Sequence, residues 1–574
     1  MVKLAIAPIV AHLSRYLGGD DPAARLAVAL ACQATQDGHV CADLDQEAGW
    51  GPWADEMSGA ERAGLIARLP DMAIVGGADD PTPLVWDGRR LSLRRYWAYE
   101  QQVALDLLAR ATTPEVLSAD MEAALDSHFA DAGQRAAARI GLVNRLALIA
   151  GGPGTGKTTT LARLIALLQE QAAQSGGPPL RIALAAPTGK AAARMTEALG
   201  ATGASTPAHS AMTLHRLLGM RADGSAFYHC RERPLAVDVL VIDEASMIDL
   251  SLMAHLLDAL PAAARLILLG DRDQLAAVEA GAVFADLCAS ERLASCVATL
   301  TASFRFAGTS GIGQLAGCLR QGDAPGAIDQ LKAAAQETRR AAQRVSRPLE
   351  GRSPHSGDFG VGTIDLDWQP QVAPQTLISA VQAGYQDYRD AVAAGLPVAE
   401  LFEHFRRFRV LCAHRQDVAE INRALTPPEA MLAQPGMAVM VVKNDPLLRL
   451  YNGDIGLALP DPVDGSLKVC FASNGDGTSA APRWIPFTRL PDWEVAWAMT
   501  VHKSQGSEFA HVLLALPASI SPVVTRELVY TGVTRARQRL SLWSSEAVLQ
   551  AACANRAGRM SGLREKLSFL TVSC

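Results

Sequence analysis

The chain of 574 residues lacks several features that would assign it to a secreted, metal-binding or membrane class. Its ten cysteines include no C-x-x-C pair and no cluster with histidine at zinc-ligand spacing, which favours reduced thiols over a disulfide framework or a zinc site. No basic-then-apolar leader opens the chain, and no uninterrupted apolar run reaches about 18 residues, so nothing indicates secretion or a membrane span. We therefore expect a cytoplasmic protein with no membrane contact.

Excess positive charge is also absent, and lysine is scarce. The formal net charge of −6 argues against a polyanion-binding surface over the whole molecule, but it is compatible with a local basic groove. Only eight of the 53 basic residues are lysines, and Lys157, Lys190 and Lys503 lie in the motifs described below. In an arginine-biased chain, a lysine can mark a position that needs a compact ammonium group, although chance would also explain the placement.

The length predicts two to four domains, and the pattern of apolar and polar residues suggests where they lie. Residues 1–112 carry helical patterns without a phosphate or metal motif, and we interpret them as a mostly helical accessory domain. From about residue 134, short apolar runs end in polar clusters, as in LALIAGGPGTGKT and VDVLVIDEAS, and a second such series begins at FRVLCAHRQ. This pattern is typical of buried parallel strands alternating with helices. We therefore predict an α/β protein with α/β domains at 113–295 and 296–574.

Two segments of the second α/β domain differ from this pattern. Residues 325–370 are rich in Arg, Ser, Pro and Gly, which predicts an irregular, mobile surface loop, with a DNA-facing basic arm as the alternative. Residues 430–490 contain short strand-like runs separated by Asn-Gly and Asp-Gly turns. That spacing predicts a small inserted β-barrel.

A nucleotide site is indicated by GGPGTGKT, which matches G-x-x-x-x-G-K-[ST] between an apolar run and a helical pattern. Glycines let backbone N–H groups curl around phosphates, Lys157 can reach the β- and γ-phosphates, and Thr158 can ligate Mg²⁺. A glycine turn before a helix is the alternative. The predicted ATP-binding residues of this segment are Gly151, Gly152, Pro153, Gly154, Thr155, Gly156, Lys157, Thr158 and Thr159.

Two carboxylates follow the apolar run VDVLVI, where a Walker B strand ends. Asp243 would hold Mg²⁺ together with Thr158, and Glu244 would orient and deprotonate the attacking water. An exposed pair of turn carboxylates is the alternative. With the P-loop, the pair predicts an ATP-hydrolysing enzyme that uses ATP and Mg²⁺.

The use of the hydrolysis energy is indicated by an ordered set of further motifs. Gln274 ends the run RLILLGDRDQ, where its amide could sense the γ-phosphate. Around it stand APTGKAAARM, TLHRLL, LTASFRF, MTVHKSQGSEF and VYTGVTRAR. From Gln134 to Leu542 this set resembles the superfamily 1 helicases, and in detail the RecD family, the alpha subunits of exodeoxyribonuclease V. The resemblance implies two RecA-like motor domains, an SH3-like form for the inserted barrel, and ATP-dependent 5′-to-3′ movement on single-stranded DNA with unwinding of duplex DNA.

The resemblance also implies roles for residues at the nucleotide. Gln134 would read the adenine edge, although a surface glutamine on a helix is the alternative. Arg305 and Arg535 would act as arginine fingers when the two motor domains close, and Glu508 would contribute to nucleotide binding. Arg537 is more simply a solvated or structural arginine.

For DNA, the resemblance implies contacts from hydroxyl, imidazole and ammonium groups that suit phosphates without reading sequence. The predicted DNA-contact residues are Thr188, Lys190, Thr213, His215, Thr500, His502 and Ser504. Any of them could cap a helix instead. The segment 219–235 has the size of a hairpin, so Phe227, Tyr228 or His229 could face a DNA fork, and a plain surface hairpin is an equal alternative.

The family works in DNA repair and recombination beside two larger subunits, so the resemblance implies a heterotrimer with RecB-like and RecC-like partners and an N-terminal domain that docks on them. Two alternatives remain open. One is a stand-alone RecD-like helicase, although residues 1–112 lack a convincing helix-hairpin-helix signature. The other is a nucleotide-dependent DNA clamp or scaffold that does not unwind.

Overall fold

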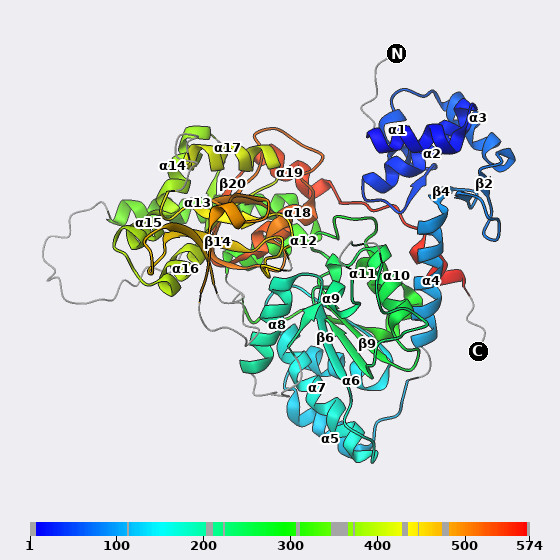
Figure 1. Ribbon diagram of the computed structural model, residues 1–574, viewed down its shortest axis with the longest axis horizontal. Helices are drawn as coiled ribbons and strands as arrows, with labels where there is room; N and C mark the ends of the chain where they lie inside the picture. The colour runs from blue at the N-terminus through cyan, green and yellow to red at the C-terminus, as the bar shows by residue number, and fades with distance from the viewer. Residues whose placement is uncertain are drawn as a thin grey trace, which may run out of the picture. The chain divides into compact units, whose positions relative to one another are not determined.

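The computed structural model describes residues 7–111, 114–201, 210–221, 224, 226–305, 310–345, 365–370, 373–426, 434–445, 447–472 and 482–570. The chain forms two units that do not follow the sequence order at every point (Figure 1). Unit 1 contains Met1–Arg272, Ala276–Ala302 and Gly558–Cys574, and unit 2 contains Asp273–Leu275 and Ser303–Ala557. No helix in these described ranges is long and apolar enough to cross a membrane.

The N-terminal region of unit 1 combines helices with a small sheet. Its helices are α1 (Pro8–Gly18), α2 (Pro22–Gln36), η1 (Glu47–Trp53), α3 (Gly59–Arg68), η2 (Leu69–Asp71) and α4 (Arg94–Arg110). Its four-stranded sheet has the order β1 (Cys41–Asp43), β4 (Arg90–Leu93), β3 (Leu84–Trp86) and β2 (Val75–Gly76). The expectation of a mostly helical domain missed this sheet, because strands of two to four residues are too short to show alternation in the sequence.

The first motor sheet is six-stranded and wholly parallel, which confirms the predicted α/β architecture. Its order is β10 (Val297–Leu300), β5 (Leu146–Gly151), β9 (Arg265–Gly270), β8 (Val239–Ile242), β6 (Ile182–Ala186) and β7 (Met212–Thr213). The predicted boundary at residue 295 is wrong, because β10 pairs with β5 as an edge strand of this sheet.

Helices cover both faces of this sheet. They are α5 (Ala119–His128), α6 (Ala132–Val143), α7 (Lys157–Gln174), α8 (Gly189–Ala201), α9 (Leu214–Leu217), η3 (Ala245–Met247), α10 (Leu250–Ala259), α11 (Val283–Cys288) and η4 (Glu291–Cys296). Successive strand residues face opposite ways, so Leu148 belongs to the core that includes α10 while Ile149 belongs to the core that includes α7. Helix α4 runs along α10 and joins the first of these cores (Figure 1). Burial on both faces explains why these strands are continuous apolar runs.

Unit 2 contains a second wholly parallel sheet. Its order is β11 (Leu366–Gln369), β20 (Ala536–Trp543), β19 (Phe509–Ala515), β12 (Phe408–Cys412) and β18 (Ala498–Thr500). Its helices are α12 (Gly311–Gln321), α13 (Ala324–Val345), α14 (Pro374–Gly384), α15 (Gln386–Ala393), α16 (Val398–Arg407), α17 (Arg415–Leu425), α18 (Arg526–Thr534) and α19 (Glu546–Ala554). Two parallel motor sheets were predicted, and both are present.

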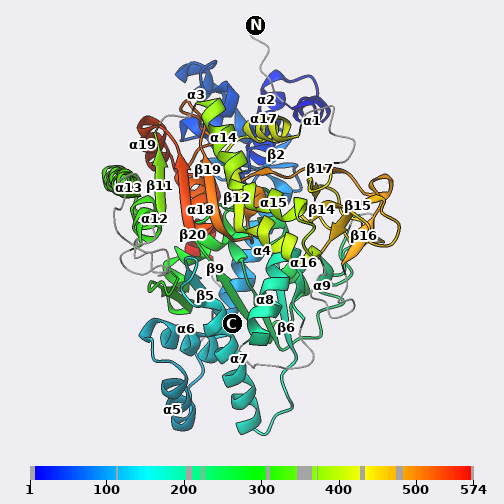
Figure 2. The ribbon, with the colours of Figure 1, turned by 90° about the vertical axis from the view of Figure 1, so that its left-hand side faces the viewer.

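The predicted irregular loop at 325–370 is wrong over much of its length. Helix α13 occupies its first part beside β11, as Figure 2 shows, and β11 occupies its end. Buried Ala327, Ile328 and Leu331 give α13 an apolar face, and its alanines favour helix over loop. Residues 346–364 of the predicted loop lie outside the described residues.

The β insertion of unit 2 is a five-stranded antiparallel sheet between α17 and β18. Its order is β16 (Arg483–Ile485), β15 (Leu467–Phe471), β14 (Ile455–Pro460), β13 (Ala438–Val441) and β17 (Trp493–Val495), with η6 (Phe487–Arg489) beside it in sequence. An antiparallel insertion is therefore confirmed at about the predicted place. Residues 430–433, 446 and 473–481 of the predicted barrel are outside the described ranges.

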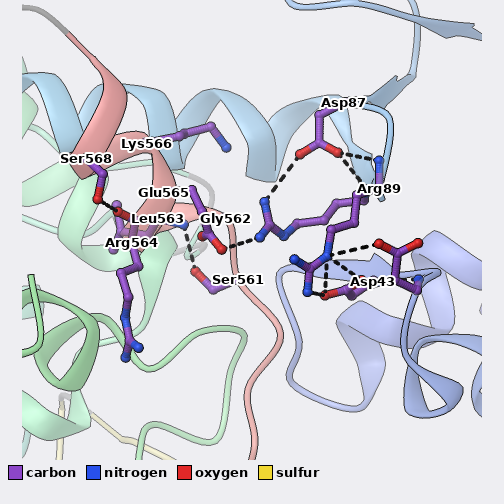
Figure 3. Close-up of polar contacts among 12 residues, drawn as sticks. Asp43, Asp87, Arg89, Ser561, Gly562, Leu563, Arg564, Glu565, Lys566 and Ser568 are labelled. Carbon is purple, nitrogen blue, oxygen red and sulfur yellow. Dashed lines mark hydrogen bonds and ion pairs between the residues drawn. The ribbon is translucent and has the colours of Figure 1, made fainter.

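The C-terminal segment, residues 558–570, was predicted in the second motor domain but belongs to unit 1. Its helix α20 (Leu563–Phe569) packs on α4. Glu565 of this helix, labelled in Figure 3, forms an ion pair with Arg90, the first residue of β4. The buried carboxylate of Glu100 on α4 accepts hydrogen bonds from Ser561 Oγ (2.9 Å), the Gly562 N–H (2.7 Å) and Lys566 Nζ. No sequence pattern predicted this return of the chain, because it depends on a pairing between residues more than 460 positions apart.

A second attachment of the C-terminal segment lies at the loop after α2. The Arg559 guanidinium donates to the carbonyls of Asp37 (3.1 Å) and Ala277 (2.9 Å). Gly38 has a φ of +83°, and a Cβ there would lie 1.1 Å from Arg559 Nη1. The left-handed backbone therefore favours glycine at position 38, and a side chain there would also displace the Arg559 guanidinium.

Candidate nucleotide and DNA sites

The P-loop connects buried β5 to α7, as the sequence predicted. Gly154 and Gly156 have φ values of +78° and +80°, which lets the loop turn back before the helix begins. Thr155 Oγ1 donates to the Gly152 carbonyl at 2.8 Å, and Lys157 Nζ donates to the Gly151 carbonyl at 2.6 Å. The ammonium therefore lies over the loop, in the position from which it can exchange carbonyls for phosphate oxygens.

The Walker B carboxylates follow β8 at the carboxyl edge of the same sheet. Burial, reinforced by the charge of Glu244, raises the pKa of Asp243 to about 6, while the Lys157 charge opposes the rise. The opposing effect shows that Asp243 lies within electrostatic reach of the P-loop lysine. A nearby cation would favour the ionised carboxylate, so the oxygen donors of Asp243 and Thr158 fit a bound Mg²⁺.

Glu244 stands in a left-handed backbone conformation with a φ of +54°. Non-glycine residues rarely adopt this conformation, and such strain concentrates at functional positions. The Glu244 N–H donates to Asp243 Oδ1 at 2.8 Å. The geometry disfavours the alternative of an ordinary exposed turn, and the sequence carried no signal for the strained backbone.

Gln134 lies in the first turn of α6, where its N–H donates to the N-capping carboxylate of Asp131 at 2.8 Å. Its side chain is buried, with 6% of its surface exposed. The alternative of a surface helix glutamine is therefore wrong, and the adenine contact stays a prediction.

The DNA-contact residues predicted in unit 1 lie at neighbouring strand ends. Strands β6 and β7 pair through Ala186 and Thr213, which brings the Thr188 and Thr213 segments side by side. Each threonine hydroxyl accepts from the N–H three residues later, at 3.3 Å in both cases. Both therefore help to begin a helix, at α8 and α9, while Lys190 is partly exposed in the first turn of α8.

The hairpin predicted at 219–235 is partly described. Met220 and Phe227 form an antiparallel bridge, and the Phe227 ring turns toward His215 (6.1 Å between centroids) and His255 (5.2 Å). Burial lowers the pKa of both histidines. Tyr228 is 54% exposed, so of the three residues proposed to face a fork it presents the most open ring. Residues 222, 223 and 225 are outside the described ranges.

In unit 2, residues 500–508 form a compact turn between β18 and β19 that includes η7 (His502–Ser504). Thr500 Oγ1 accepts the Lys503 N–H at 3.4 Å, and His502 is partly exposed. Ser504 is fully buried and donates to the Val501 carbonyl at 2.7 Å. In this conformation the Ser504 hydroxyl shapes the turn, and its DNA contact stays a prediction.

The same turn holds both predicted arginine fingers. Arg305 Nη2 donates to Glu508 Oε1 at 2.8 Å. Arg535 is 2% exposed, and its guanidinium donates to the carbonyls of Ser507 (Nη1, 3.3 Å) and Thr531 (Nε, 3.3 Å). Neighbouring residues 507 and 508 thus bind the two arginines that the sequence placed in separate motifs. Arg537 is exposed, as expected of a solvated arginine, and lies 4.0 Å from Glu508.

Gln274 is buried on the tripeptide 273–275, which follows β9 of the first motor sheet yet belongs to unit 2. The Leu275 side chain is part of the unit 2 core. This placement brings the predicted phosphate-sensing residue into the same unit as the 500–508 turn and Arg535.

Sequence comparisons agree with this arrangement of motifs. Three family models match: an AAA domain over residues 134–280, a UvrD-like helicase C-terminal domain over 495–543, and the N-terminal domain of RecBCD enzyme subunit RecD over 4–91. RecBCD enzyme subunit RecD of Mycolicibacterium smegmatis is 40% identical over 98% of this chain and 97% of its own length. The chain belongs to the RecD family. It is an ATP-dependent DNA helicase of superfamily 1 that serves DNA recombination and repair.

For two further relatives, the match covers different shares of the relative's own length. RecD of Mycobacterium tuberculosis is 38% identical over 97% of this chain and 94% of its own length. The ATP-dependent RecD2 DNA helicase of Deinococcus radiodurans is 33% identical, and the match covers 74% of this chain but only 50% of that protein. A Bacteroides Pif1 helicase structure with ADP-AlF3 and single-stranded DNA aligns over 75% of this chain and 92% of its own, at 17% identity and a TM-score of 0.39.

Sequence reasoning missed two residues of the RecD site in unit 2. The Thr531 hydroxyl accepts a hydrogen bond from the Leu275 N–H, and the Ser507 carbonyl holds Arg535. Gln505 of the 500–508 turn donates to the carbonyl of the same Leu275. The meeting of Gln505 and Thr531 at Leu275 joins positions more than 200 residues apart, and no spacing rule signals it.

Proposed function

We propose that this RecD family helicase moves 5′ to 3′ on single-stranded DNA and unwinds duplex ahead of it. The direction of movement is taken from the RecD resemblance. One observation carries the coupling of hydrolysis to movement on DNA: the 500–508 turn, which contains predicted DNA-contact residues, also holds Arg305 and Arg535 through Glu508 and Ser507. A shift of the turn on DNA would change the freedom of both arginines. Hydrolysis and DNA binding are thereby linked through a few backbone and side-chain contacts.

Each residue predicted at the nucleotide has a role in the hydrolysis step. The loop 151–159 binds the phosphates, with Lys157 as a point charge, and Gln134 holds the adenine. Mg²⁺, held by Thr158 and Asp243, would supply charge neutralisation at the phosphates. Glu244 orients the attacking water and takes its proton, and Gln274 contacts the γ-phosphate. Arg305 and Arg535 stabilise the charge that develops in the transition state once they leave their resting partners.

The remaining predicted residues bind DNA. Thr188, Lys190, Thr213 and His215 of the first motor domain, with Thr500 and His502 of the second, contact phosphates and sugars of one strand. Such contacts read no sequence, as a translocating enzyme requires. Tyr228 on the 219–235 hairpin is the candidate to meet the duplex.

The chain works as one subunit of a heterotrimer with RecB-like and RecC-like partners, and its N-terminal region is the docking surface. The support is that RecBCD enzyme subunit RecD of Mycolicibacterium smegmatis matches this chain over nearly its full length. The match of residues 4–91 to the N-terminal domain of RecBCD enzyme subunit RecD favours this form over the stand-alone alternative. We expect the protein in the cytoplasm, where its DNA substrate would be found.

Strand separation on duplexes with either a 5′ or a 3′ single-stranded tail tests the proposal, using the purified chain alone and then with its RecB-like and RecC-like partners. For the chain alone, we expect unwinding from the 5′ tail only, and we expect stronger unwinding of that duplex with partners. Unwinding from the 3′ tail by the chain alone would overturn the polarity. DNA-stimulated ATP hydrolysis without unwinding, even with partners, would favour the clamp instead.

A further inference from the structure

The backbone of Leu275 is held on both sides by residues of unit 2. Its N–H donates to Thr531 Oγ1 at 2.9 Å, and its carbonyl accepts from Gln505 Nε2 at 2.9 Å. Thr531 has no exposed surface, Gln505 is 7% exposed and the Leu275 side chain is 6% exposed. Two buried hydrogen bonds and one buried side chain therefore fix this peptide in position, and we call the three residues the Leu275 clamp.

The clamp residues stand next to groups with proposed roles. Leu275 directly follows Gln274, so a displacement of the Gln274 backbone also displaces the clamped peptide. Thr531 on α18 lies about one helical turn before Arg535, the C-cap residue of that helix, and the Thr531 carbonyl accepts from Arg535 Nε. Gln505 lies within the 500–508 turn, two residues before Ser507, which holds Arg535 from the other side.

We infer that Gln505 and Thr531 are positioning residues that transmit the state of the γ-phosphate from Gln274 to the DNA-binding turn and to Arg535. Buried hydrogen bonds of good length are stiff, so a displacement of Leu275 moves both partners or breaks a bond in a site that water does not reach. The clamp couples DNA binding to hydrolysis and touches neither DNA nor nucleotide itself. The inference rests on the proposed role of Gln274.

Single substitutions that remove one clamp bond test this directly. Thr531→Val keeps the side-chain volume but removes the hydroxyl, and Gln505→Met keeps the length but removes the amide. Thr531→Ser retains the hydroxyl and serves as the conservative rescue. Thr534→Val is the matched control, because Thr534 is equally buried on the same helix, yet its hydroxyl donates only to the Thr531 carbonyl.

The readout is the ratio of ATP hydrolysis rates with and without a single-stranded oligonucleotide, measured on the full chain. We expect Thr531→Val and Gln505→Met each to lower this stimulation ratio about tenfold, a factor equivalent to about 1.4 kcal/mol. Thr531→Ser should keep most of the ratio, and Thr534→Val should match the wild-type chain. Thermal melting of Thr531→Val and Thr534→Val should coincide within a few degrees.

An unchanged ratio in both clamp variants would overturn the inference. If the hydrolysis rates with and without DNA fall by the same factor, the ratio is also unchanged, and the defect is purely structural. Gln274→Ala in the same assay distinguishes a failure of the sensor role of Gln274 from a failure of the clamp. If Gln274→Ala hydrolyses ATP normally, the sensor role fails. If Gln274→Ala is defective while the clamp variants keep a normal ratio, the sensor role stands and the clamp alone is wrong.

Discussion

Arg305 Nη2 lies 2.8 Å from Glu508 Oε1, and both side chains are largely shielded, with 20% and 11% exposed. The Glu508 carboxylate therefore neutralises an arginine that the family resemblance assigns to the γ-phosphate. Arg537, on the other side of the carboxylate at 4.0 Å, is 64% exposed and adds little. We interpret the pair as a resting state in which Glu508 restrains Arg305.

Replacing Glu508 with Gln tests this restraint. A partly buried ion pair worth about 1 kcal/mol restrains its arginine by a factor of about five, so DNA-free ATP hydrolysis should rise by about that factor. Steady-state hydrolysis without DNA measures it, with Arg537→Gln as the control expected to stay near wild type. A weaker affinity for ATP with no rise in the maximal rate would instead favour the predicted role of Glu508 in nucleotide binding.

Arg535→Ala should slow hydrolysis on the order of 10³-fold while sparing ATP binding, because an arginine finger acts on the transition state. The substitution also leaves the carbonyls of Ser507 and Thr531 without their guanidinium donor, so unfolding should become easier by about 1–3 kcal/mol. Single-turnover hydrolysis and urea unfolding measure the two effects separately. If replacing the exposed Arg537 slows hydrolysis as much as replacing Arg535, the arginine finger has been assigned to the wrong residue.

Asp243 makes the stability of the protein depend on pH in a definite direction. Its pKa is about 6 in the folded chain against an ordinary value of 3.8, so folding favours the protonated form. This contribution to stability is fully present below about pH 4 and is lost as the pH rises through 6. Asp243→Asn should therefore stabilise the nucleotide-free chain at pH 8, and less so at pH 5. Urea unfolding at both pH values measures the difference in the free energy of unfolding between Asp243→Asn and the wild-type chain. An equal difference at pH 5 and pH 8 would contradict the raised pKa of Asp243.

The C-terminal segment should contribute to the stability of unit 1 through Glu100. Glu100→Gln removes a buried charge that pairs with Lys566, so it should lower the free energy of unfolding by about 2 kcal/mol. Ser561→Ala removes only one of the hydrogen bonds to Glu100 and should cost about 1 kcal/mol. Chemical denaturation compares the two, and a larger loss for Ser561→Ala would show that the charge pair is not what holds the segment.

Much of the fold and the nucleotide site could be predicted because their signals are local. A buried parallel strand is an apolar run, and a P-loop needs its glycines and lysine at fixed spacing, so β5, β8 and Lys157 were placed correctly. The N-terminal sheet could not be predicted, because its strands are two to four residues long. The burial of Ser504, the strain at Glu244 and the Leu275 clamp depend on contacts across the fold, which leave no mark on local spacing.

Displacement of streptavidin from biotinylated single-stranded oligonucleotides tests the central claim most directly, because it reports directional movement without any duplex. With ATP, we predict rapid displacement from the 3′ end, slow displacement from the 5′ end, and neither with Lys157→Gln. Faster displacement from the 5′ end would contradict the direction of movement. Equal, unaccelerated loss from both ends, despite DNA-stimulated hydrolysis, would contradict the motor itself.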